Sequence, residues 1–157
     1  MDREMRRLEI GKAELLREGK DIVLVGIGHT VIPALKAAQD LSQLGIEAAV
    51  VNARFVKPLD RELLLELLAR IPSLITVEDH VLDGGFGSAV LELLADEGIA
   101  DVKVRRLGVP DRFTPQGTQE ELRKMCGIDK DAIAQAALQM VRGEKKRKKE
   151  GWERGSA

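Results

Sequence analysis

Short runs of mostly β-branched residues alternate along this chain with longer segments in which apolar residues recur every three or four positions. The run at 22–25 is typical of a buried strand, and the segment from residue 31 has the period of an amphipathic helix. Such alternation predicts a mainly parallel sheet with helices on both faces. The predicted strands are 22–25, 46–51, 74–77 and 102–107, and the predicted helices are 31–44, 61–70, 88–97, 118–127 and 129–141.

Polar residues mark several of the predicted helix starts. Asp60 precedes a leucine-rich helix, and its carboxylate can accept hydrogen bonds from free amides of the first turn. Thr118 and Glu121 have the spacing of a capping box, in which each side chain caps the other residue's backbone amide. In the first helix the predicted buried stripe consists of Ile32, Leu35, Ala38 and Leu41, with Ala34 as a further candidate.

The 157 residues are enough for one domain, predicted at 21–141. Residues 1–20 are predicted to be a linker or edge segment, with 8–10 and 14–16 as extended pieces. Residues 142–157 are predicted to be a disordered, solvated tail, because little there is apolar. We favour this over contact with RNA or an acidic partner. The basic residues of the tail are Arg142, Lys145, Lys146, Arg147, Lys148, Lys149 and Arg154.

Composition excludes several classes of site and location. One Cys and two His cannot supply the four ligands of a structural Cys/His zinc site. Three Phe, one Trp and no Tyr, with a net charge of −1, argue against a nucleic-acid surface. We find no apolar stretch of membrane-spanning length and no signal peptide, so we expect a cytoplasmic protein.

The first strand ends in a turn that could hold an anion. Gly26, Gly28, His29 and Thr30 follow it directly, and the free amides of a helix start attract phosphate. The dinucleotide fingerprint fails, however, because Val31 stands where a third glycine is required. We therefore favour a tight packing turn over a small nucleotide-binding oxidoreductase.

Two later loops carry charged candidates. Arg54 could clamp a carboxylate or phosphate, or it could serve an interface or ion pair. Glu78 and His80 follow a predicted strand and could form an acid–base pair, although no nucleophile accompanies them. We favour a structural or interface role over catalysis at this loop. The sequence thus offers anion or interface candidates and no assigned catalytic, cofactor-binding or metal-binding residue.

An ordered series of motifs over residues 8–141 resembles the C-terminal domain of the 1-deoxy-D-xylulose-5-phosphate synthase family, within the transketolase superfamily. The stretch from Arg54 to Asp60 separates this family best from its relatives. The motifs are Ile10-Gly-Lys12, Leu16-Arg-Glu-Gly-Lys-Asp21, Val51-Asn-Ala-Arg-Phe-Val-Lys-Pro-Leu-Asp60, Thr76-Val-Glu-Asp-His80, Gly84-Gly-Phe-Gly-Ser88, Leu107-Gly-Val-Pro-Asp-Arg-Phe113 and Gln116-Gly117.

The resemblance implies a three-layer α/β/α sandwich of about five strands, one of them antiparallel. It implies a section of a thiamine-diphosphate enzyme that condenses pyruvate with glyceraldehyde 3-phosphate for isoprenoid, thiamine and pyridoxal biosynthesis. In that family the coenzyme and magnesium lie between two preceding domains. We therefore expect no cofactor on this chain alone and a supporting role in a homodimer, with those two domains as partners in the same or a separate chain.

Two alternatives remain open at this point. The chain could be an independent interaction module, or it could be a subunit of a split thiamine-diphosphate complex of the transketolase or 2-oxo-acid dehydrogenase type. Whether it has enzymatic activity of its own is not determined by its sequence.

Overall fold

The computed structural model describes the backbone of residues 7–154 and the side chains of residues 7–143. Five strands form one sheet in the order β1-β3-β2-β4-β5. The strands are β1 (Glu14–Arg17), β2 (Ile22–Gly26), β3 (Ala48–Asn52), β4 (Ser73–Val81) and β5 (Lys103–Val109). The helices are η1 (Gly28–Thr30), α1 (Val31–Gln43), α2 (Arg61–Arg70), α3 (Phe86–Asp96), α4 (Gln119–Cys126) and α5 (Lys130–Arg154).

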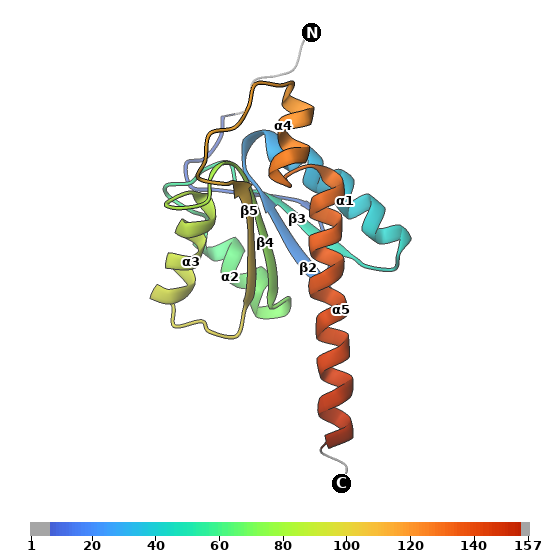
Figure 1. The fold of residues 1–157 in the computed structure, drawn as a ribbon. Helices are drawn as coiled ribbons and strands as arrows, with labels where there is room; N and C mark the ends of the chain where they lie inside the picture. The colour runs from blue at the N-terminus through green and yellow to red at the C-terminus, as the bar shows by residue number, and fades with distance from the viewer. Residues whose placement is uncertain (1–6, 155–157) are drawn as a thin grey trace.

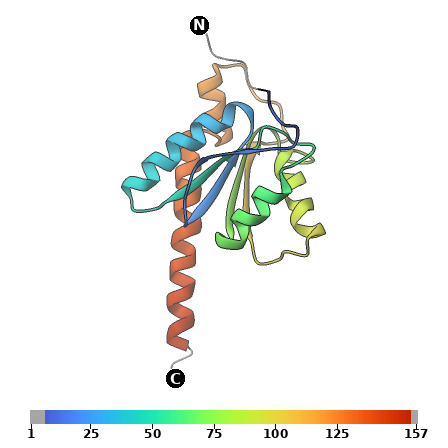
Figure 2. The same cartoon turned by 180° about the vertical axis from the view of Figure 1, so that it is seen from behind.

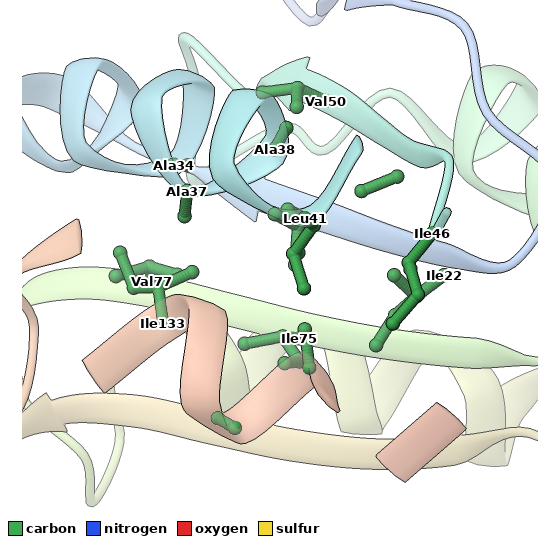
Figure 3. Packing of buried hydrophobic residues seen from close by; sticks show 14 of the residues in the cluster. Ile22, Ala34, Ala37, Ala38, Leu41, Ile46, Val50, Ile75, Val77 and Ile133 are labelled. Carbon is green, nitrogen blue, oxygen red and sulfur yellow. The ribbon is translucent and has the colours of Figure 1, made fainter. Parts of the chain in front are cut away.

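The helices cover both faces of the sheet, which confirms the predicted α/β/α sandwich (Figures 1 and 2). Successive residues of a strand point to opposite faces, so every buried strand contributes to two cores. On β2, Ile22 and Leu24 pack toward α1 and α5, whereas Val23 and Val25 pack toward α2 and α3. Figure 3 shows the first core, in which Leu41 and Ile133 approach the sheet from two helices.

The sheet is parallel except at one edge. β1 pairs antiparallel with β3, while the β2–β3, β2–β4 and β4–β5 pairs are parallel. The reversed strand that the resemblance implied is therefore confirmed, and it coincides with the edge segment expected at 14–16. Residues 8–10 form no strand.

The face that α1 buries matches the predicted stripe in part, since Ala34, Ala38 and Leu41 are buried as expected. Its buried residues are Val31, Ala34, Ala37, Ala38 and Leu41. Ile32 is instead 62% exposed. A helix advances about 100° per residue, so once Val31 and Ala34 face the sheet, Ile32 is turned away from it.

The basic C-terminal segment follows directly on the last helix. The backbone of α5 runs to Arg154 and projects past the end of the sheet (Figure 1). The disordered, solvated character expected of residues 142–157 stays a prediction. Lys, Arg and Glu favour helix and no Pro interrupts the segment, which offsets the lower helix propensity of Gly143 and Gly151. Between residues 7 and 154 the structure contains no helix with the length and apolarity needed to cross a membrane.

Asp60 caps α2 as predicted and also holds the N-terminal segment. One carboxylate oxygen accepts a hydrogen bond from the Leu63 amide at 3.2 Å, and the other accepts one from the Ala13 amide at 2.9 Å. Asp60 is buried. It therefore ties residues before β1 to the loop that follows β3.

The predicted capping box at the start of α4 is confirmed. The Thr118 hydroxyl accepts from the Glu121 amide, and the Glu121 carboxylate accepts from the Thr118 amide and hydroxyl. These bonds favour the charged carboxylate, led by the one from the backbone amide, and hold the pKa of Glu121 below its ordinary value.

Thr118→Ala is expected to raise the pKa of Glu121 toward its ordinary value, because the hydroxyl bond is lost. A carboxylate with a lowered pKa stabilises the fold above its unfolded-state pKa and loses that contribution as the pH falls through its folded pKa. NMR titration of the Glu121 side-chain carbon checks this, with Glu120, which has no such bonds among those described, as the internal control. An unchanged Glu121 titration in the variant would contradict the capping role.

Candidate functional site

The carboxyl ends of β2 and β4 open into a cavity of about 420 Å³. In an open α/β sheet this edge is the usual place for a ligand. The cavity brings together the predicted candidates Gly28, His29, Glu78 and His80. Its other lining residues are Ile27, Val56, Asp79, Gly84, Gly85 and Phe86.

Glu78 is fully buried at the base of this site, and both of its carboxylate oxygens are occupied. One accepts a hydrogen bond from the Phe86 amide at 2.6 Å, and the other accepts one from the Gly87 amide at 2.8 Å. Both amides belong to the first turn of α3, whose N-terminal residue Gly85 offers no side-chain cap. Glu78 therefore caps α3 from strand β4. A carboxylate at this place interacts favourably with the positive end of the helix dipole.

Two element boundaries next to this contact differ from the predicted ones. β4 runs to Val81 instead of ending at residue 77, and α3 begins at Phe86 instead of Ser88. Glu78 thus lies within a strand and does not stand in a loop as an acid–base partner of His80.

Small residues around Glu78 allow the close approach. A Cβ on Gly85 would lie 2.1 Å from a Glu78 carboxylate oxygen, and one on Gly108 would lie 3.0 Å from the Glu78 Cγ. A Cβ on Gly87 would lie 2.7 Å from the Thr76 hydroxyl oxygen. The glycine-rich motif therefore fits α3 onto β4 and β5 around a buried carboxylate.

Arg106 of β5 fixes the loop that leads into α3. Its guanidinium donates to the Leu82 carbonyl at 2.7 Å and to the Ser88 hydroxyl at 2.9 Å, and Asp83 lies 4.0 Å away. We did not predict this role from the sequence. An arginine on a strand that borders a glycine-rich turn was the signal that could have indicated it.

The turn between β2 and α1 is also held by contacts within the domain. The Thr30 hydroxyl is buried and donates to the Val77 carbonyl at 2.7 Å, which joins the start of α1 to β4. A Cβ on Gly26 would lie 3.0 Å from the backbone of Val31. Gly26 and Thr30 therefore pack the turn and do not line the cavity.

The two histidines are, with Gly28, the exposed candidates of the site. His29 lies in η1 and His80 lies near the end of β4, and both line the cavity. The His80 Nδ1 is 2.9 Å from the Val81 carbonyl oxygen. Among the candidates, these rings are the ones that can meet a molecule arriving at this end of the sheet.

Arg54 lies outside the cavity and is paired. Its guanidinium is 2.5 Å from the Glu14 carboxylate on β1, and its amide donates to the Asn52 side chain at 3.1 Å. The backbone there is left-handed, with φ of 58°. Of the two roles predicted for Arg54, the geometry supplies the ion pair, which joins the loop after β3 to the edge strand.

The donors at this edge do not suit a magnesium diphosphate group. No cluster of three His, Cys, Asp or Glu side chains that could hold a metal ion occurs in the part of the chain that the structure describes. The α3 N-terminus, which could otherwise bind phosphate, is filled by Glu78. We therefore derive no chemical step through thiamine diphosphate from the described residues.

Comparison with known proteins identifies the family. Residues 11–133 match the family described as "Transketolase, C-terminal domain". The chain belongs to the transketolase C-terminal domain family. This result confirms the resemblance found in the sequence.

Within this family the chain is similar to 1-deoxy-D-xylulose-5-phosphate synthases. It is 56% identical over 136 residues to 1-deoxy-D-xylulose-5-phosphate synthase 1 of Geobacter sulfurreducens, covering 87% of this chain and 21% of the relative. It is 48% identical over 141 residues to the synthase of Halothermothrix orenii, covering 90% of this chain and 22% of the relative. The chain thus spans about a fifth of the length of these relatives.

Solved structures agree on the fold. A protein titled "Split gene transketolase, inactive beta4 tetramer" is 36% identical, with a TM-score of 0.80 over 87% of this chain and 44% of that one. A transketolase mutant from Pichia stipitis is 20% identical, with a TM-score of 0.58 over 84% of this chain and 18% of that one. At that identity the second likeness supports the fold alone.

Proposed function

We propose that this chain acts as the C-terminal section of a 1-deoxy-D-xylulose-5-phosphate synthase, where it supports packing and homodimer assembly in the cytoplasm. The observation that carries this proposal is the identity of about half to 1-deoxy-D-xylulose-5-phosphate synthases over almost the whole chain. The intact enzyme would use thiamine diphosphate and magnesium, held by the two domains that precede this section in the family.

The geometry of the sheet edge supports a structural role. Three of the polar candidates, Glu78, Thr30 and Arg54, already have partners within the domain. Glu78 caps α3, Thr30 bonds β4 and Arg54 pairs with Glu14. The edge leaves exposed His29, His80 and Asp79 beside the half-buried or exposed apolar residues Ile27 and Val56, a mixed surface that suits contact with another domain.

The purified chain is expected to show no turnover with pyruvate, glyceraldehyde 3-phosphate, thiamine diphosphate and magnesium. The physical reason is that its described residues offer no donor set for the magnesium diphosphate. A coupled assay for carbon dioxide release checks this, with the full Geobacter sulfurreducens synthase as the positive control. Product above the blank would overturn the supporting role.

A second candidate is a subunit of a split enzyme, favoured by one specific observation. The 36% identical neighbour is titled a split gene transketolase in a beta4 tetramer, and this chain covers 44% of it. Sequencing the coding region upstream distinguishes the two. If the thiamine-diphosphate domains lie in the same reading frame, the section of a single synthase is favoured; if they lie in a separate gene, the split subunit is favoured.

A further inference from the structure

Large apolar side chains are exposed mainly at one end of the molecule. They lie where the parallel strands end, on the N-terminal segment and on loops and helices that follow β2, β3 and β5. We call this the carboxyl-end apolar surface, and its members are Leu8, Ile10, Ile32, Val56, Phe113 and Met125.

Phe113 is the most exposed of these residues. Its ring is fully exposed, in the loop between β5 and α4, beside Met125. Ile10 is 74% exposed on the segment before β1. Ile32 and Val56 each border a hollow that His29 also lines, so the surface adjoins the cavity at the sheet edge.

This gathering is unlike the rest of the described surface. Leu16, Leu44 and Leu91 are also exposed, but they lie on β1, at the C-terminal end of α1 and within α3. Isolated exposed apolar residues are ordinary, whereas a group of them at one end marks an interaction surface. An exposed Phe ring is also the kind of anchor that contributes most to interfaces.

The position of the N-terminal segment indicates what covers this surface. The matched section is a C-terminal domain and about a fifth of its relatives' length, so the remainder of such a synthase joins it through this segment. The segment lies at the same end of the molecule (Figures 1 and 2): Gly11 packs closely against Pro58, and the Lys12 amine is 2.6 Å from the Glu62 carboxylate. In such a synthase the preceding domains are therefore connected at the carboxyl end of the sheet.

Resting on the proposed function, we propose that the carboxyl-end apolar surface docks onto the thiamine-diphosphate-binding part of the same synthase. Phe113 and Ile32 insert into an apolar surface of that part. The opposite end of the sheet, where α1 terminates near Leu44, stays in solvent.

The test uses a full-length chimera, in which residues 8–141 of this chain replace the matching section of the 56% identical Geobacter sulfurreducens synthase. Ile32→Gln and Phe113→Ser are the docking variants. Leu44→Gln is the matched control, because Ile32 and Leu44 lie at the two ends of the same helix and are each 62% exposed. None of the three substitutions adds or removes a trypsin site.

Loss of docking should expose the connection between the sections. Trypsin cleavage there is expected to be about fivefold faster or more in each docking variant, as for loss of an interface anchor, and synthase activity should fall in parallel. Leu44→Gln should leave both within about twofold, in the range of neutral surface substitutions. Circular dichroism of each variant shows that the domain itself remains folded.

Each other outcome contradicts the docking surface in a distinguishable way. An unmodified chimera without activity would contradict the proposed function and the docking surface with it. An active chimera in which Ile32→Gln and Leu44→Gln behave alike would overturn the docking surface alone. Conversion of dimers to monomers on size exclusion, with unchanged cleavage between the sections, would assign the surface to a second copy and also overturn the proposal.

Discussion

Glu78→Ala is expected to lower the free energy of unfolding by about 3–5 kcal/mol, since each buried donor left without a partner costs about 1–3 kcal/mol. The Phe86 and Gly87 amides, now 2.6 and 2.8 Å from the carboxylate, would lose their acceptor. The volume vacated at a fully buried position adds to the loss. Domains of this size have total stabilities of about 5–15 kcal/mol, so the effect would be a large part of the whole.

Urea unfolding followed by circular dichroism measures this change. Glu92→Ala is the control, because Glu92 lies exposed on the same helix α3, and its removal should cost less than about 0.5 kcal/mol. Glu78→Gln should fall between them, since the amide oxygen can cap one backbone N–H while its nitrogen faces the other. A loss below about 1 kcal/mol for Glu78→Ala would show that capping by this carboxylate does not hold α3 in place.

Gly19→Ala is expected to cost about 3 kcal/mol, at the upper end of the usual range for overpacking. A Cβ at this position would lie 2.0 Å from the Ala49 nitrogen and 2.3 Å from the Ala48 carbonyl carbon, both backbone atoms of β3. Backbone held in register by the β2–β3 ladder cannot move aside as a flexible side chain can. Relief would require the β1–β2 connection to leave β3, which would break the bonds from the Lys20 and Asp21 amides to the Glu47 carbonyl.

Hydrogen exchange localises this effect, because the β1 amides should lose protection before those of β2. The control is Gly143→Ala on α5, where no atom lies within 4 Å of the added methyl group. That change should be neutral or stabilise by about 0.5–1 kcal/mol, since alanine favours helix over glycine. Equal stability of the Gly19→Ala variant and the unchanged protein would mean that the turn before β2 is not packed as described.

Most of the secondary structure could be predicted because its signals are local. The buried runs of β2 and β3, the cap at Asp60 and the capping box at Thr118 each depend on residues within a few positions. The predictions are wrong where a local pattern does not determine which face of a helix packs against the sheet. Ile32 fits the period of α1, but which face of that helix meets the sheet is set by packing, and the structure leaves Ile32 in solvent.

Of the candidates named from the sequence, Gly28, His29, Glu78 and His80 line the cavity, whereas the contacts that each candidate makes could not be predicted. Strand-end geometry indicated Glu78 and Arg54 as candidates; Glu78 lies within the second half of β4, and Arg54 lies two residues after the end of β3. No local pattern indicates that Glu78 meets amides eight and nine positions later, or that Arg54 meets Glu14 across 40 positions. A glycine at the N-terminus of α3, without a cap of its own, was the available signal for the first of these contacts.

The amino-acid sequence by itself determined the order and type of the elements, the α/β class and the family, because periodicity and motif spacing are properties of neighbouring residues. Only the tertiary structure decided that the charges at the sheet edge are matched internally and that apolar side chains gather beside them. Both depend on which elements pack together. That packing is decided by all the buried surfaces of the domain at once, so it cannot be predicted from any single segment.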